Sequence, residues 1–150
     1  MEKIVFDTGI KEFEVNNGGV LRFNPSDPNV YARFMDLTSE IGKIEKEMAK
    51  RAEKLENDNE EKRGAGALRI MRDADDKVKQ LLAEVFGSEN DFGKLFEGVN
   101  LMAVASNGER VVTNFFEAIE PIMVSGVKAC VSDEVAAAKA EREQRNGNYE

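Results

Sequence analysis

Apolar side chains in the first 24 residues are spaced as in β-strands. Ile4-Val5-Phe6 is a short apolar run, and two further runs, 11–15 and 20–24, flank Asn16-Asn17-Gly18-Gly19. Asn-Gly and Gly-Gly pairs tolerate the positive φ angles of a tight hairpin turn. We therefore expect a β-hairpin of about residues 11–15 and 20–24, with residues 3–7 as a third strand beside it. Because an isolated hairpin is marginally stable in water, this sheet must lie on helices or on another copy.

A helix start follows at Asp27-Pro28. The Asp27 carboxylate can accept hydrogen bonds from the N–H groups of the first turn, where Pro28 fits because its missing N–H would be unpaired anyway. From there, apolar residues recur at intervals of three and four, which is the spacing of a heptad seam. The seam consists of Val30, Phe34, Leu37, Ile41, Ile44, Met48 and, after a lapse at Arg51, Leu55. A helix from residue 28 to about residue 62 would span roughly 50 Å at 1.5 Å per residue.

This seam has two interpretations. In the first, it packs against the chain's own domain, and the helix ends in a solvated, charged stalk. In the second, it binds another chain, either a second copy or an elongated partner, and Ile41, Ile44, Met48 and Leu55 are candidate partner-binding residues. Both can hold together if the first half of the helix faces the core while Ile44 to Leu55 face outward.

The next interruption of the helical pattern is Gly64-Ala65-Gly66. Each glycine costs roughly 1 kcal/mol relative to alanine inside a helix, so the sequence favours a turn here, although a bent continuation is allowed. A second amphipathic helix is predicted over about residues 67–86, and Gly87 is placed to end it. This helix is expected to pair with the first one as a helical hairpin.

Two further helices and a tail are predicted beyond Gly87. A short helix lies within residues 88–98, where Ser88 is followed three residues later by an acid. A fourth helix follows the Ser106-Asn107-Gly108 turn, and Pro121 should kink it or split it in two. Residues 132–145 are rich in alanine and charge, and they predict a helix that frays toward Glu150.

These elements predict an α+β fold that is mainly α. A β-hairpin or three-stranded meander comes first, followed by a long helix, a helical hairpin and further helices. We expect a single domain over residues 1–132, with a β region in 1–24 and a helical region in 28–132. Residues 133–150 are expected to form a charged tail that is helical or disordered.

Aromatic residues suggest a second candidate surface. Most of the nine phenylalanines are expected in the core. Phe115 and Phe116 are adjacent, however, and they point about 100° apart on a helix, so one of them is expected to leave the core. Together with Ile122 and Met123, they are the second set of candidate partner-binding residues.

Composition narrows the range of functions. The 150 residues include 21 basic and 29 acidic side chains, for a net charge of −8, with one cysteine and no histidine. Without histidine, the chain has no Ser-His-Asp or Cys-His catalytic arrangement and no imidazole ligand for zinc. The dispersed negative charge would repel nucleic acid. Cys130 lies in an apolar stretch and is expected to be a small core residue.

No group of residues predicts catalysis. Asp73, Asp75 and Asp76 are clustered, but lysines are spaced to pair with them on a helix, and the glycine-turned loop of a calcium site is missing. We therefore expect no catalytic, cofactor-binding or metal-binding residues, and no enzyme. The start lacks the apolar region of a signal peptide and no run is long enough to span a membrane, so a cytoplasmic protein is expected.

Two stretches carry a family resemblance. FNPSDPNVYARF, residues 23–34, ends the β region and opens the long charged helix, and VFGSENDFGKLFEG, residues 85–98, links helices before an apolar helix. Together they resemble the small tail assembly chaperones of long-tailed bacteriophages and prophages. The resemblance covers most of residues 1–130 in the order of elements, and it carries no catalytic or metal-binding residue.

The resemblance implies a non-enzymatic protein of the bacterial host cytoplasm. Such a chaperone binds the tape measure protein, a long, hydrophobic, helical chain, and keeps it soluble until tail tube subunits polymerise around it. Apolar helical faces can bind such a client, and a negatively charged surface keeps the complexes dispersed. The alternative is a structural subunit of a phage particle or another assembly, which associates with itself through the hairpin and the seam. Neither hypothesis includes nucleic acid or a membrane, and a homo-oligomer is expected.

Overall fold

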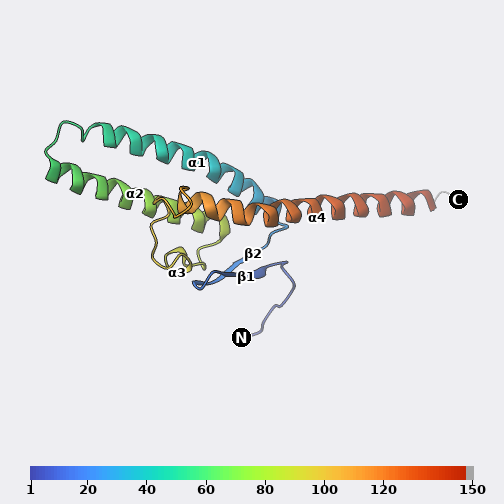
Figure 1. Ribbon diagram of the computed structural model, residues 1–150. Helices are drawn as coiled ribbons and strands as arrows, with labels where there is room; N and C mark the ends of the chain where they lie inside the picture. Colours follow the sequence, from blue (N-terminus) through green and yellow to red (C-terminus); the bar gives the residue numbers. More distant parts are fainter. Residues whose placement is uncertain (148–150) are drawn as a thin grey trace.

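The chain folds as an α+β structure dominated by long helices (Figure 1). The computed structural model describes residues 1–147. The elements, in chain order, are β1 (Lys11–Val15), β2 (Gly19–Phe23), α1 (Pro28–Glu53), α2 (Glu60–Phe86), α3 (Phe92–Leu95) and α4 (Val111–Gly147). The predicted fold class, an N-terminal hairpin followed by long helices, is confirmed.

β1 and β2 form the predicted antiparallel hairpin, in which Phe13 lies opposite Leu21. A hydrogen bond of 2.9 Å from the Gly18 N–H to the Val15 carbonyl closes the turn. Asn16 has a φ of 45°, and asparagine tolerates this left-handed conformation better than most residues do. The inner face of the hairpin lies against the helices, where Leu21 is almost completely buried.

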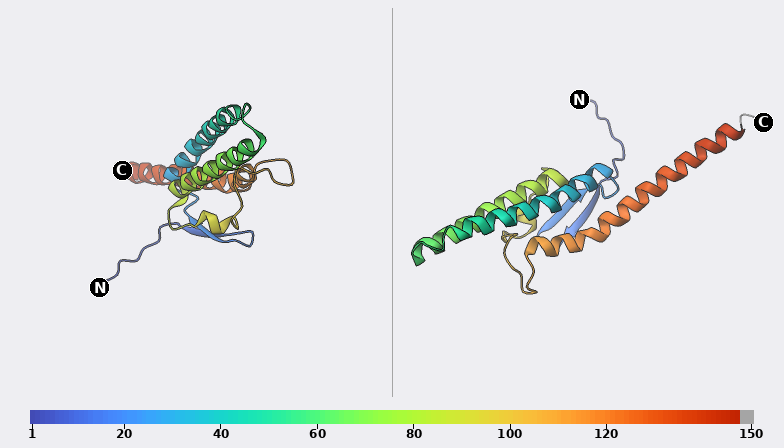
Figure 2. Two further views of the ribbon diagram at one scale, coloured as in Figure 1. Left: turned by 90° about the vertical axis from the view of Figure 1, so that its left-hand side faces the viewer. Right: turned by 90° about the horizontal axis from the view of Figure 1, so that it is seen from above.

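The predicted third strand is wrong, because residues 3–7 pair with no strand. They belong to an extended segment, residues 1–7, which we call the N-terminal arm and which leads away from the helices (Figure 2). The Thr8 carbonyl accepts a hydrogen bond of 3.0 Å from Asn24 Nδ2. Since Asn24 directly follows β2, this bond holds the chain away from the outer edge of β1.

α1 begins as predicted and ends earlier than predicted. Asp27 Oδ1 accepts a hydrogen bond of 2.9 Å from the Asn29 N–H, and Pro28 is the first helical residue. Residues 54–59 then connect α1 to α2, and Asn59 Oδ1 caps α2 by accepting from the Lys62 N–H at 2.8 Å.

The predicted turn at Gly64-Ala65-Gly66 is wrong, because these residues lie inside α2. The Asn59 cap starts the helix upstream of both glycines. Gly66 also has a packing role, since a Cβ there would lie 2.7 Å from Leu55 Cδ2. The Leu55 side chain therefore packs against the backbone of α2 at Gly66. This contact compensates for part of the cost that glycine has in a helix.

We expect Gly64→Ala to stabilise the fold by about 0.5–1 kcal/mol, because alanine loses less backbone entropy than glycine in a helix. Among the described residues, no atom that such a Cβ would meet lies within 4 Å of it. Gly66→Ala is the comparison, and it should gain less because its Cβ presses on Leu55. Urea unfolding followed by circular dichroism measures both. A destabilising effect of Gly64→Ala would contradict a helix that is continuous through residue 64.

α1 and α2 pack side by side as the predicted helical hairpin (Figure 1). The seam of α1 is turned toward α2, and Ile44 is only 5% exposed. Two ion pairs bridge the helices beside this part of the seam, from Arg51 to Asp73 at 3.0 Å and from Lys77 to Glu47 at 3.4 Å. The seam therefore packs against the chain's own domain, as in the first of its two interpretations.

α4 runs without a break from Val111 to Gly147, so of the two predicted effects of Pro121, a kink or a split, the split is wrong. Ile119 and Met123, on either side of Pro121, are buried in the core and hold the helix in place. The missing N–H of Pro121 frees the carbonyl of Glu117. Glu117 is exposed, so water can satisfy that carbonyl.

Beyond Gly126, α4 leaves the rest of the molecule and projects into solvent (Figure 2). Residues 131–147 of this projection are all exposed. Of the predicted tail, residues 133–147 are helical. The predicted fraying falls partly on residues 148–150, which lie outside the described residues.

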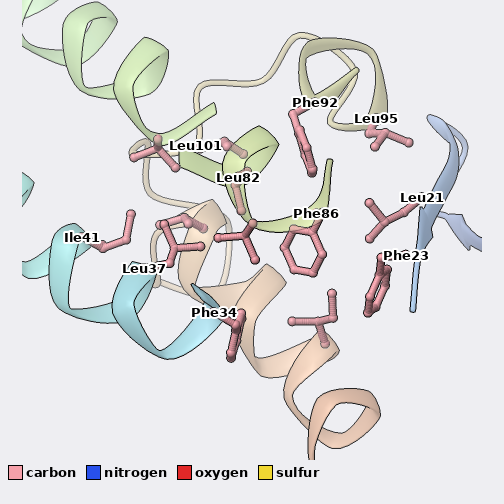
Figure 3. Packing of buried hydrophobic residues seen from close by; sticks show 14 of the residues in the cluster. Leu21, Phe23, Phe34, Leu37, Ile41, Leu82, Phe86, Phe92, Leu95 and Leu101 are labelled. Carbon is pink, nitrogen blue, oxygen red and sulfur yellow. The ribbon is translucent and has the colours of Figure 1, made fainter. Parts of the chain in front are cut away.

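The core lies where the hairpin, α1, α2, α3 and the first half of α4 meet (Figure 3). Phe86, the last residue of α2, occupies its centre. Its ring centroid lies 5.0 Å from that of Phe23, 6.4 Å from Phe34, 6.2 Å from Phe92 and 6.1 Å from Phe115. One side chain thus joins the hairpin, α1, α3 and α4.

Candidate partner-binding surfaces

The first predicted partner surface is mostly occupied within the chain. Ile41 and Ile44 are buried against α2, Met48 is half-buried at the edge of the core, and Leu55 is half-buried against Gly66. The expectation that Ile44 faces outward is therefore wrong. The physical reason is the early end of α1, which lets α2 fold back along the whole seam.

The second predicted set divides between the core and the surface. Met123 is fully buried. Phe116 packs edge-on against Phe34, with centroids 5.5 Å apart. Phe115 contacts the Phe96 ring at 5.0 Å, and its remaining surface lines a groove together with Ile122. Phe115 and Ile122 thus lie on an accessible surface, whereas Met123 does not.

This groove lies between the inner face of the hairpin and the first half of α4. We call it the hairpin groove, and its volume is about 490 Å³, within the range of about 300–1,000 Å³ that is typical of ligand pockets. Phe13, Val15 and Leu21 form the hairpin wall. Ala118 and Ile122 belong to the α4 wall. The groove is therefore apolar on both sides and is wide enough for a few side chains.

The projecting half of α4 is a second accessible surface, and it is not among the surfaces predicted from the sequence. Its apolar residues advance by three or four positions and so share one helical face. They are Val127, Val131, Val135 and Ala138, of which Val127 is half-buried and the other three are exposed. Val131 is 56% exposed and Val135 is 60% exposed. The spacing was visible in the sequence, but the high content of alanine and charge hid it.

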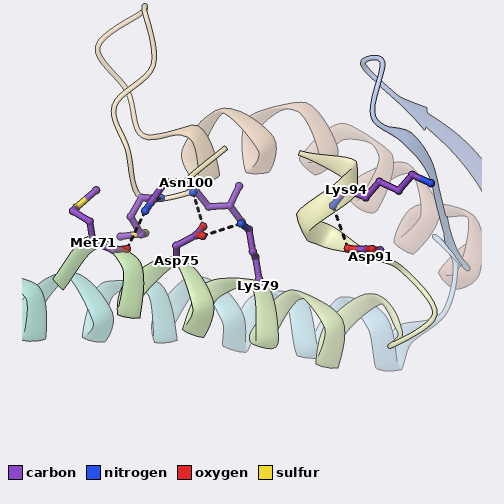
Figure 4. A network of polar contacts seen from close by, with 8 residues as sticks. Met71, Asp75, Lys79, Asp91, Lys94 and Asn100 are labelled. Carbon is purple, nitrogen blue, oxygen red and sulfur yellow. Dashed lines mark hydrogen bonds and ion pairs between the residues drawn. The ribbon is translucent and has the colours of Figure 1, made fainter. Parts of the chain in front are cut away.

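The acidic cluster has a structural role. Asp75 Oδ1 accepts a hydrogen bond of 2.8 Å from the buried Leu101 N–H, and Asp75 Oδ2 pairs with Lys79 Nζ at 2.8 Å (Figure 4). Asn100 Nδ2 donates to the Met71 carbonyl at 3.0 Å. These bonds hold the loop after α3 on α2. Within residues 1–147, no three acidic or cysteine side chains come together as a metal site.

Cys130 is half-buried on α4, so the expectation of a core position is wrong. It lies where α4 leaves the rest of the molecule, beyond Gly126, the last buried residue of this helix. In the described part of the chain, every helix is too short or too polar to cross a membrane.

Comparisons of the chain with protein-family models, with curated proteins and with solved structures find no match.

Proposed function

We propose that this protein is a non-enzymatic tail assembly chaperone that binds a tape measure protein and keeps it soluble in the host cytoplasm during tail assembly. The proposal starts from the resemblance of residues 23–34 and 85–98 to that family. The observation that carries it is the projecting half of α4, which offers an exposed apolar stripe to a helical client.

An amphipathic client helix can cover such a stripe with its own apolar face. The charges beside the stripe are of both signs. Lys128, Lys139, Arg142 and Arg145 are the basic residues, and Asp133, Glu134, Glu141 and Glu143 are the acidic ones. The stripe can therefore approach clients of either charge without strong repulsion. The net charge of −8 keeps chaperone–client complexes apart from one another.

The test is co-expression with the tape measure protein that the resemblance implies in the neighbouring reading frame. We expect a larger soluble fraction of the tape measure protein with the chaperone than without it. Val131→Glu/Val135→Glu should abolish most of this gain, because it places two charges in the apolar stripe. No gain from the unmodified chaperone would refute the proposed function.

Ala136→Glu/Ala140→Glu is the matched control for the stripe. These alanines are exposed on the same projecting helix, and at about 100° per residue they lie about 100–180° around the helix from Val131 and Val135, on the side away from the stripe. The control has the same added charge and should retain the gain in client solubility. If both double variants lose it equally, the stripe is not the binding surface.

The alternative function is a self-associating structural subunit of the particle. The exposed N-terminal arm and the apolar hairpin groove favour this alternative, since both are suited to contacts between copies. Mass spectrometry of finished virions separates the two functions. A structural subunit remains in the virion, whereas a chaperone is absent from it.

A further inference from the structure

The two edges of the hairpin differ. Asn90 Oδ1 accepts a hydrogen bond from the Arg22 N–H at 2.9 Å, and Asn90 Nδ2 donates to the Arg22 carbonyl at 3.0 Å. Asn90 therefore caps the outer edge of β2 as a neighbouring strand would. Asn90 is buried and also donates to the Phe86 carbonyl at 3.0 Å, so it cannot easily be displaced.

The edge of β1 has no such cover. Arg22 pairs with Glu12, and its backbone groups point away from β1 toward Asn90. In an antiparallel ladder, Glu12 and Glu14 then point their own N–H and C=O groups toward the opposite side. Among the described residues, no strand lies beside that edge. An open edge of this kind is a template for an added strand.

The N-terminal arm has the properties of such a strand. It is extended, and its apolar residues Ile4 and Val5 are 89% and 88% exposed. Side chains alternate between the faces of a strand. Ile4 and Phe6 therefore share one face, while Lys3, Val5 and Asp7 share the other. One face of the arm is thus apolar, and the other carries charges.

The arm is held away from its own β1 edge. The bond from Asn24 Nδ2 to the Thr8 carbonyl fixes the base of the arm beside the end of β2. A second bond of 2.8 Å, from the Gly9 N–H to Asp7 Oδ1, supports the bend. To pair with its own β1, the arm would have to break the Asn24 bond and reverse within three residues. The open edge is more accessible to the arm of another copy.

The hairpin groove lies beside the same strand. Phe13 and Val15 of β1 form part of its wall, and Phe115, Ala118 and Ile122 of α4 face them. A strand added to β1 continues the inner face of the sheet over α4. Alternate side chains of that strand then enter the groove, where apolar surface is removed from water.

We propose that residues 3–7 of one copy of this chain bind a second copy as a strand added to β1, with Ile4 and Phe6 in the hairpin groove. The interaction is β-augmentation, in which backbone hydrogen bonds supply affinity and the groove selects alternate side chains. It does not depend on the proposed function. Because each copy has an arm and a groove, a reciprocal dimer or a longer chain of copies can form.

Sedimentation velocity over a range of protein concentrations tests this arrangement. Ile4→Asn should weaken self-association by roughly tenfold or more, because a polar amide replaces an apolar side chain in the groove. Val5→Asn is the matched control. Val5 is as exposed as Ile4, but it faces outward from the added strand, and a neutral side chain there does not repel Glu12 and Glu14, so association should stay within about twofold. Equal effects of the two variants would refute the strand geometry.

A mixing experiment identifies the two halves of the contact. One chain lacks residues 1–7 and keeps the groove, and the other carries Ala118→Arg, which fills the groove and keeps the arm. Ala118 is exposed and arginine favours helices, so this variant should fold normally. We expect each chain alone to be monomeric and the mixture to form a heterocomplex.

Every other outcome overturns the proposal. A monomeric unmodified chain at high concentration shows that the arm does not join copies. Self-association that survives loss of residues 1–7 shows that another surface is used. If the two chains remain separate after mixing, the arm and the groove are not partners.

Discussion

Replacement of Phe86 by alanine is expected to destabilise the protein by about 3–5 kcal/mol, the range for truncating a buried phenylalanine. This side chain is 4% exposed and contacts aromatic rings from the hairpin, α1, α3 and α4. Its removal leaves a cavity at the single point where these elements meet. Since a whole domain is stable by only about 5–15 kcal/mol, this loss is a large fraction of the total free energy of unfolding, and the urea midpoint should fall accordingly.

Phe6→Ala is the control for this prediction because it removes the same atoms from a side chain that is 73% exposed. Its effect should stay within about 0.5 kcal/mol in dilute solution, as is usual for surface substitutions. Urea unfolding monitored by circular dichroism gives both values. A loss of less than about 1 kcal/mol for Phe86→Ala would show that the core is not centred on this ring.

Replacement of Gly126 by alanine is expected to cost about 1–3 kcal/mol or more, because it forces backbone elements apart. A Cβ at this position would overlap the Pro25 carbonyl. Neither partner is a flexible side chain, so α4 or the segment before α1 must move. Gly126 is also the last buried residue of α4, and the angle at which the helix projects depends on this contact.

Gly42→Ala is the matched control. Gly42 lies in the middle of α1, and within the described part of the chain a Cβ there meets no atom within 4 Å. The same substitution should therefore stabilise the protein by about 0.5–1 kcal/mol. Opposite signs for the two variants in urea unfolding would support the docking of α4 on Pro25. Equal stabilisation would mean that α4 does not pack there.

The two proposed interactions use separate parts of the molecule. The N-terminal arm and the hairpin groove lie around β1, whereas the stripe that includes Val131 and Val135 lies on the projecting half of α4. A copy can therefore bind another copy and a client at the same time. If both proposals hold, several stripes in an assembly of copies would act on one long client, and binding would become stronger through multivalency.

Local chemistry in the sequence determined much of the fold. Asp27 and Pro28 specify the start of α1, because a cap and a fixed φ act within one turn. Asn16-Asn17-Gly18-Gly19 specify the hairpin turn, because asparagine and glycine tolerate the positive φ angles of a tight turn. The heptad spacing from Val30 to Ile44 identified an apolar face correctly. These signals act over a few residues and do not depend on what lies elsewhere in the chain.

Only the tertiary structure decided which apolar faces are covered. The spacing of the α1 seam did not specify its partner, and the early turn at residues 54–59 placed α2 on Ile44. The bond from Asn24 to Thr8 kept residues 3–7 off their own sheet, although their pattern is that of a strand. Gly126 mattered because Pro25, about a hundred residues earlier in the chain, lies against it. The local sequence pattern predicts an element and its apolar face. Which segment packs on that face depends on contacts between residues that are distant in the chain, and these cannot be read from a local pattern.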